Sequence, residues 1–157
     1  MTNSNQFFLL VKISVIAFII GVVSLPSSLE LASPFWLLSF FSYWLIYSKG
    51  KNIFKSAFIL GILLDIIQGG VLGQNALALV LSSAFILSVK KSFFVSNLTT
   101  QQVYIFLGSA IYLIIFLLVH QLVQDFNFNF EWLILLSPFT GAILWPLIRS
   151  FLAKLKQ

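Results

Sequence analysis

Long hydrophobic runs, separated by short polar or basic stretches, extend along most of the chain. A helix that crosses a membrane needs about 20 apolar residues, and somewhat fewer where basic or aromatic ends reach the interface. The pattern predicts an all-α integral membrane protein, with one polytopic domain over residues 1–157 that is a bundle of about six transmembrane helices. The expected spans are 7–25, 34–47, 53–67, 71–89, 103–123 and 131–151.

Two of these segments allow a second interpretation. Residues 7–25 could be a cleaved secretory signal, but Lys12 lies inside the run and no clear small-x-small cleavage site precedes Pro26, so we expect a retained span. Residues 53–89 are slightly too few for two ordinary spans and could instead form a re-entrant hairpin with both ends on one side. Charge does not separate these two possibilities.

Aromatic residues and helix breakers distinguish two other spans. The short span 34–47 is expected to use its aromatic side chains for packing and as an interfacial belt; these residues are Trp36, Tyr43, Trp44 and Tyr47. The last span is expected to be kinked by residues that disturb a helix; these are Pro138, Gly141 and Pro146.

The stretch 58–75, FILGILLDIIQGGVLGQN, carries Asp65 deep inside a hydrophobic run. If 53–67 is helical, Ala57, Gly61 and Asp65 recur every four residues on one face. Small residues at this spacing let membrane helices approach closely, and an ionisable group in lipid must turn toward a partner or water. We expect Asp65 to point into the bundle. It is an anchor between helices, a carboxyl bonded to a helix end, or a site of proton or ligand chemistry.

The fourth span has the most small residues and is the expected partner of this face. Its small residues are Ala76, Ala78, Ser82, Ser83, Ala84 and Ser88. Between the two helices, Gly69 and Gly73 break the helical pattern, and such glycines more often mark a turn than a binding loop.

Further polar side chains follow Asp65 or lie on the same side of the predicted bundle. Together with Asp65 they could line a polar pocket, and they are Gln68, Gln74, Asn75 and His120. A histidine at the end of a span is more often an interfacial hydrogen-bonding group than a proton relay.

Composition supports the membrane class and excludes several functions. The chain is 60% hydrophobic with a mean hydropathy of +1.05, more apolar than a water-soluble domain of this size. Its nine basic residues lie in short segments without interleaved aromatics, which argues against nucleic acid. There is no cysteine and one histidine, so no metal or cofactor is expected. No paired acid and base or nucleophile with its base is present, so we predict no enzyme.

The basic residues also predict the topology. In a six-span arrangement all nine fall on one side, whereas the connections around Glu30, 69–75 and 125–131 contain no lysine or arginine. Basic residues accumulate on the cytoplasmic side of membrane proteins, so both termini are expected in the cytoplasm. The basic residues are Lys12, Lys49, Lys51, Lys55, Lys90, Lys91, Arg149, Lys154 and Lys156.

Three segments, PFWLLSFFSYWL, FILGILLDIIQGGVLG and TGAILWPLIRSFLAKLKQ, resemble the MreD family of rod-shape-determining inner-membrane proteins. The likeness runs from Pro34 to the C-terminus. Its most specific part is Gly61-x-x-x-Asp65 with the Leu72-Gly73 pair, followed by Leu144-Trp145-Pro146.

The resemblance implies a multi-pass, non-enzymatic scaffold of the cell elongation machinery, or elongasome, in the bacterial inner membrane. Such a protein partners MreC, works alongside RodA, a class B penicillin-binding protein and MreB, and supports lateral peptidoglycan synthesis. Its bundle is expected to be similar to the substrate-binding component of ECF-type vitamin transporters. That kinship keeps an alternative open, a small-solute binding or transport subunit with a polar pocket around Asp65. Which helix face binds a partner, the oligomeric state and the ionisation of Asp65 stay open.

Overall fold

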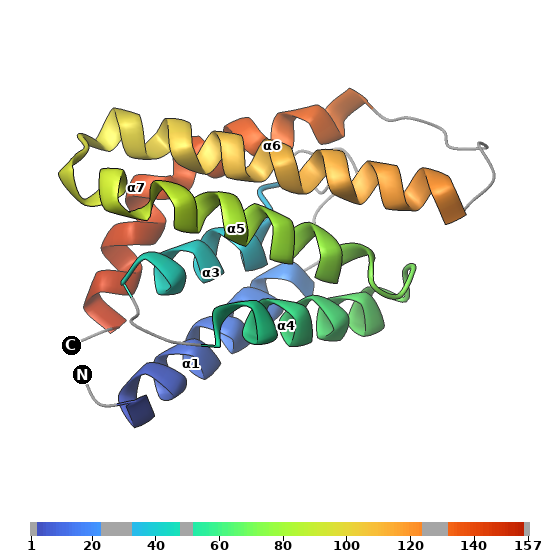
Figure 1. The fold of residues 1–157 in the computed structure, drawn as a ribbon, viewed down its shortest axis with the longest axis horizontal. Coiled ribbons are helices and arrows are strands. Elements are labelled where there is room, and N and C mark those ends of the chain that lie inside the picture. The colour runs from blue at the N-terminus through green and yellow to red at the C-terminus, as the bar shows by residue number, and fades with distance from the viewer. Residues whose placement is uncertain (1–2, 23–32, 48–51, 124–131, 156–157) are drawn as a thin grey trace.

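The computed structural model describes residues 3–22, 33–47, 52–123 and 132–155 (Figure 1). These residues form six α-helices and one 3-10 helix, with no strand among them. The elements are α1 (Asn3–Val22), α3 (Trp36–Tyr47), α4 (Ile53–Gln68), α5 (Gln74–Val95), α6 (Leu98–Val123), η1 (Trp132–Leu136) and α7 (Ser137–Leu155). The predicted all-helical membrane fold is confirmed.

Helix ends differ most from the expected spans between α5 and α6. The expected fourth span ends at residue 89, but α5 continues to Val95, and α6 begins at Leu98, five residues before the expected start at 103. Hydrophobicity marks the lipid-facing part of a helix, whereas the backbone hydrogen-bond ladder extends into its polar ends. Residues 90–102, which lie between the two expected spans, are therefore mostly helical.

Some sequence predictions fall outside the described residues. These are the end of the first span at residue 25, the connection around Glu30, the positions of Lys49 and Lys51, the 125–131 connection and Lys156.

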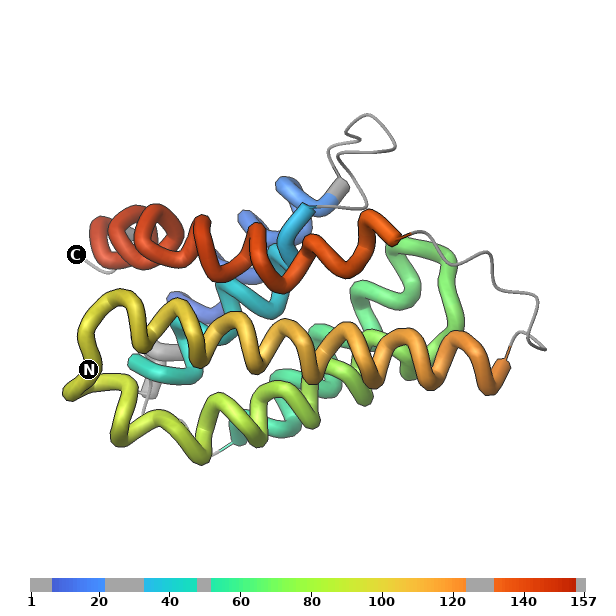
Figure 2. The backbone as a smooth tube through the Cα atoms, turned by 90° about the horizontal axis from the view of Figure 1, so that it is seen from above, coloured from blue at the N-terminus to red at the C-terminus, as the bar shows by residue number. Residues whose placement is uncertain are grey.

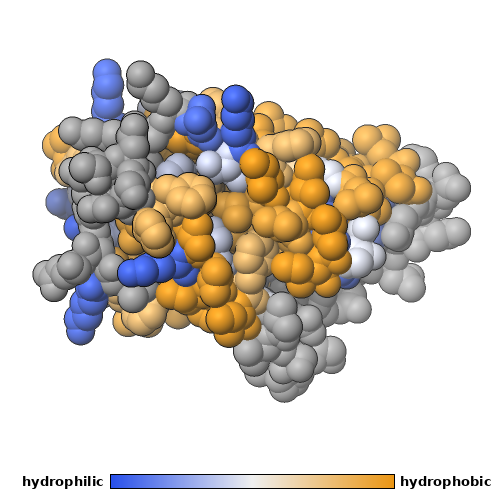
Figure 3. Space-filling view, turned by 90° about the horizontal axis from the view of Figure 1, so that it is seen from below, coloured by the Kyte–Doolittle hydropathy of each residue, from blue (hydrophilic) through white to orange (hydrophobic). Residues whose placement is uncertain are grey.

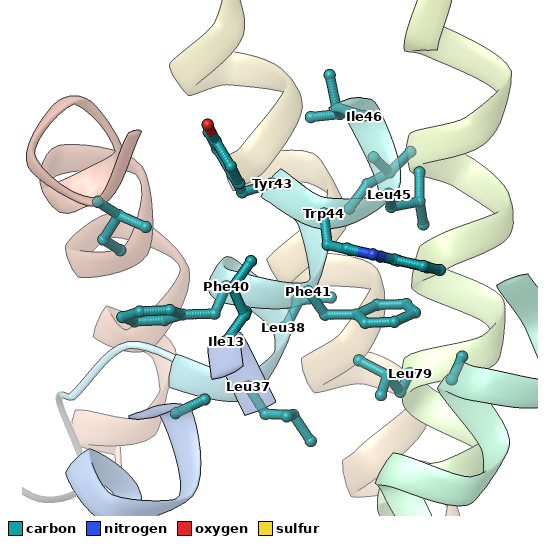
Figure 4. Close-up of a cluster of buried hydrophobic side chains, with 14 of the residues drawn as sticks. Ile13, Leu37, Leu38, Phe40, Phe41, Tyr43, Trp44, Leu45, Ile46 and Leu79 are labelled. Atoms are coloured by element: carbon teal, nitrogen blue, oxygen red, sulfur yellow. The ribbon is translucent and has the colours of Figure 1, made fainter. Parts of the chain in front are cut away.

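Helix α3 occupies the centre of the bundle, although it has only 12 residues and is about 18 Å long. Ten of its residues are buried, and α1, α5, α6 and α7 all pack against it. Figure 4 shows Phe41 and Trp44 extending from α3 toward Leu79 of α5. The helix therefore supplies much of the hydrophobic core.

This position corrects the expected aromatic belt. Tyr43 and Trp44 are buried in the core, while Trp36 and Tyr47 are half-buried. A short helix surrounded by four others presents its aromatic rings to protein, so the two buried rings pack in the interior instead of lying at the membrane interface.

The two ends of the molecule differ in charge. Figure 1 places the start of α1, the end of α7 and the α5–α6 connection at one end, and the α4–α5 connection at the other. Lys55 lies in the first turn of α4, Lys90 and Lys91 near the end of α5, and Lys154 in the last turn of α7, so these lysines share the first end. Figure 3 shows hydrophilic residues gathered mostly toward that end of a largely hydrophobic face.

Three segments are long and apolar enough to cross a membrane: Gln74–Val95, Leu98–Val123 and Trp132–Lys154. Phe7–Gly21 and Trp36–Tyr47 are shorter apolar helices. With the apolar residues exposed on most helices, these lengths define a membrane protein.

The last helical segment is irregular, in line with its prolines. It starts as a 3-10 helix, becomes α-helical at Ser137 beside Pro138, and contains Pro146 inside the α-helix. Figures 1 and 2 show the C-terminal part of α7 running in a different direction from its first part. An internal proline removes one backbone hydrogen bond and clashes with the preceding turn, which bends a helix.

Candidate functional site

Helices α4 and α5 meet at the small-residue face identified in the sequence. A Cβ atom added at Gly61 would lie 2.3 Å from the Cα of Ala76 and 2.6 Å from its backbone nitrogen. Ala57, one turn before Gly61, is fully buried, as is Ala76. Only glycine permits this approach, because any side chain at Gly61 would collide with backbone that cannot rotate away.

Asp65 caps the ends of both helices. Its backbone carbonyl accepts a hydrogen bond from the N–H of Gly69 at the end of α4. Its carboxylate accepts from the N–H of Gly73 at 2.8 Å and of Asn75 at 3.0 Å, at the start of α5. Gly69 and Gly73 have φ values of 64° and 93°, a left-handed conformation that favours glycine. The predicted turn glycines thus reverse the chain around one acidic residue.

The Asp65 carboxylate is buried, with 1% of the residue exposed. Its oxygens accept three hydrogen bonds, two from backbone N–H groups and one from the Asn75 side chain at 2.8 Å. These donors are uncharged, but they sit at the positive N-terminal end of the α5 dipole, which favours a negative group. The geometry matches the sequence-based alternative of a carboxyl bonded to a helix end.

Asn75 extends this cluster to α6. Its amide nitrogen also donates to Gln68 at 3.0 Å, and its amide oxygen accepts a hydrogen bond from the hydroxyl of Tyr112. The Tyr112 ring in turn lies 4.6 Å from the ring of Phe35, just before α3. We call Asp65, Gln68, Gly73, Asn75 and Tyr112 the junction cluster. It joins three helices through hydrogen bonds within the protein.

The structure brings together only part of the predicted polar pocket. Asp65, Gln68 and Asn75 bond to one another, whereas Gln74 donates its amide to the Phe116 carbonyl of α6 at 2.9 Å. His120 lies one turn beyond Phe116 and stacks on its ring at 6.3 Å.

Tyr112 was missed by the sequence interpretation. It lies inside a hydrophobic run, and a tyrosine hydroxyl at such a position needs a hydrogen-bond partner when buried. A hydroxyl inside a hydrophobic run was therefore the one signal in the sequence for Tyr112, but the sequence pattern does not identify its hydrogen-bond partner.

A second polar cluster, also missed, lies at the basic end. Arg149 of α7 donates to the buried amide oxygen of Gln101 at 2.9 Å. The Gln101 amide nitrogen donates to the carbonyls of Phe93 at 3.2 Å and Ser96 at 3.1 Å. Lys90 donates to the Leu45 carbonyl at 2.8 Å, which links α5 to α3. Gln101 and Lys90 therefore fix the helix ends opposite the junction cluster.

Both clusters hold helices in place. Within the described part of the chain, no group of three or more His, Cys, Asp or Glu side chains could bind a metal ion. The acceptors of Asp65 and Asn75 are occupied by protein donors, so the arrangement fits a structural role.

These observations define a small all-helical membrane protein with two polar clusters that join its helices. The sequence profile of the MreD family, described as "rod shape-determining protein MreD", matches residues 1–155. The chain is also similar to the rod shape-determining protein MreD of Haemophilus influenzae (strain ATCC 51907 / DSM 11121 / KW20 / Rd). The two are 28% identical over 155 residues, which cover 97% of this chain and 93% of that protein.

The chain therefore belongs to the MreD family, and it has a role in cell shape as part of the rod-shape machinery. The resemblance seen in the sequence is confirmed. No solved structure is a significant match to the chain, so the expected similarity to the substrate-binding component of ECF-type transporters stays a prediction.

Proposed function

We propose that this protein is a non-enzymatic scaffold of the elongation machinery in the bacterial inner membrane. It binds an MreC-like single-span partner and supports lateral peptidoglycan synthesis. The observation that carries the proposal is the junction cluster, where the buried acidic residue Asp65 caps two helices. Membership of the MreD family supplies the cellular context.

A scaffold needs a fixed shape more than a reactive group. Buried polar networks whose members are all bonded make a helix arrangement unique, because every alternative leaves groups unpaired. Asp65 and Asn75 have this property, and the close contact at Gly61 adds a steric constraint between the same helices. A solute-binding subunit would instead need polar groups free to bond the solute.

The proposed partner contacts are helix faces in the membrane. On α4, a wide outward face is apolar and exposed; its residues include Phe58, Ile59, Leu63, Ile66 and Ile67. Helices associate in lipid through packing and hydrogen bonds, so an apolar face can receive a partner's single helix without a charged interface. RodA, a class B penicillin-binding protein and MreB are proposed members of the same assembly.

We further propose that the protein is multi-pass, with both termini in the cytoplasm. The lysines at the ends of α4, α5 and α7 share one end of the molecule, as the positive-inside rule requires of cytoplasmic segments. The α4–α5 connection lies at the opposite end of the molecule from the α5–α6 connection (Figure 1), which supports two crossings by residues 53–89 over a re-entrant hairpin.

Depletion in the host bacterium tests this function. Rod-shaped cells are expected to become spherical and to recover when the wild-type chain is supplied. Cells that keep their shape but lose uptake of a vitamin or another small solute would contradict the scaffold and favour the solute-binding alternative.

A further inference from the structure

A groove separates the outer faces of α6 and α7, which run side by side in Figure 2. Its volume is about 290 Å³ and its walls are almost wholly apolar. Helix α6 supplies one wall and α7 the other; the lining residues are Thr99, Gln102, Val103, Phe106, Phe139, Ala142 and Ile143. Ile143 is 68% exposed, so the groove opens outward. We call it the α6–α7 groove.

The two polar residues of the lining lie at one end of the groove. Thr99 and Gln102 lie in the first turns of α6, while the walls beyond them are valine, phenylalanine, alanine and isoleucine. Arg149 follows Ala142 on α7 by two turns, and its hydrogen bond to Gln101 holds it at the level of the first turn of α6. This is also the end of the molecule that carries the helix-terminal lysines.

The walls indicate which kind of chain the groove can hold. They are almost wholly apolar, and the groove opens outward beside Ile143. An extended hydrocarbon chain fits such walls, because it needs no hydrogen bonds from them. Both α6 and α7 are candidate spans, so the groove opens where lipid chains lie.

We propose that the α6–α7 groove binds an anionic phospholipid from the leaflet at the basic end of the molecule. One acyl chain lies along the paired rings of Phe106 and Phe139 and beside Ile143. The phosphate lies near Thr99 and Arg149, where the first N–H groups of α6 also point outward. Anionic headgroups are attracted to such basic helix ends. The inference does not depend on the scaffold proposal.

Lipid retention tests this site. The purified full-length protein is reconstituted with equal phosphatidylglycerol and phosphatidylethanolamine, extracted with mild detergent and weighed by native mass spectrometry. Wild type is expected to retain phosphatidylglycerol selectively. Ala142→Phe fills the groove and should lower retention at least tenfold. Ala84→Phe, the same change at an exposed position of α5, should retain the lipid like wild type.

A cross-linking experiment tests the same site without the Ala142→Phe variant, which could fail to fold. A photoreactive phenylalanine analogue at Ile143 should give phosphatidylglycerol adducts well above the bulk lipid ratio. The same analogue at Leu77, exposed on α5, should follow the bulk ratio. Three outcomes would overturn the proposal. They are equal adduct ratios at Ile143 and Leu77, equal lipid retention by the Ala142→Phe and Ala84→Phe variants, and a protein adduct at Ile143 in native membranes.

Discussion

Gly61 of α4 and Ala76 of α5 touch backbone to backbone, since a Cβ atom at Gly61 would lie 2.3 Å from the Ala76 Cα. This contact sets the distance between the two helices at the point where Asp65, one turn further along α4, reaches the start of α5. Steric fit and hydrogen bonding thus act on the same helix pair.

The contact predicts that even Gly61→Ala destabilises the protein. The added methyl group meets backbone atoms, so the helices must separate, at a cost of about 1–3 kcal/mol. Gly70→Ala is the matched control, because Gly70 has nothing within 4 Å of an added Cβ and an ordinary φ. Thermal unfolding in detergent should show a lower Tm for Gly61→Ala only. Equal Tm values for the two variants would remove the tight-contact argument.

Substitutions at Asp65 should rank by the hydrogen bonds they keep. Asparagine can still accept from Asn75 through its single oxygen, but its NH2 group faces the N–H of Gly73 and that bond is lost. Asp65→Leu leaves every one of these donors unpaired, at about 1–3 kcal/mol for each buried group. Stability should fall from wild type to Asp65→Asn and further to Asp65→Leu. If Asn is as harmful to cell shape as Leu while protein level and Tm stay normal, the charge itself has a role.

The Tyr112 hydroxyl should contribute more to stability than that of Tyr104. Tyr112→Phe leaves the buried amide oxygen of Asn75 without its donor, whereas the Tyr104 hydroxyl pairs with Ser92 in an exposed position. We expect a loss of about 1–2 kcal/mol for Tyr112→Phe and little change for Tyr104→Phe. Comparing the two variants by thermal unfolding isolates the buried hydrogen bond, and equal losses would contradict its place in the junction cluster.

The local sequence pattern predicted the α4–α5 hairpin well, because the glycines and the acidic residue that form its turn all lie within 58–76. Spacing placed Gly61 and Asp65 on one face, and the glycines marked the turn. Tyr112 could not be assigned to Asn75 in this way, because the two lie on helices whose relative rotation depends on the whole bundle. Tyr43 and Trp44 were expected partly at the interface, because hydropathy does not distinguish a helix facing lipid from one surrounded by protein.

Gln101 should be important at the basic end. Gln101→Leu removes the acceptor of Arg149 and the donor to the carbonyls of Phe93 and Ser96, so the α5–α6 turn and α7 lose their shared link. A loss of about 1–3 kcal/mol is expected. Gln102→Leu, the same change at the neighbouring half-buried position, should leave the Tm in lipid-free detergent nearly unchanged. A larger loss for Gln102→Leu would contradict this assignment.

Single-cysteine labelling tests the proposed topology without background, because the chain contains no cysteine. Asn97→Cys, in the α5–α6 connection, should react with a membrane-impermeant maleimide only after the inner membrane is opened. Gly70→Cys, in the α4–α5 connection, should react in intact spheroplasts. Both positions are exposed. Labelling of both from the same side would show that residues 53–89 do not cross twice as proposed.

The scaffold proposal is tested most directly by purifying the protein from native membranes and identifying what stays bound. An MreC-like protein with a single membrane span should co-purify and remain bound through a high-salt wash, because packing between helices in lipid is not screened as surface charge is. The Gly70→Ala variant should retain this partner like wild type. Recovery of the chain with no single-span protein, from cells in which it restores rod shape, would contradict the account.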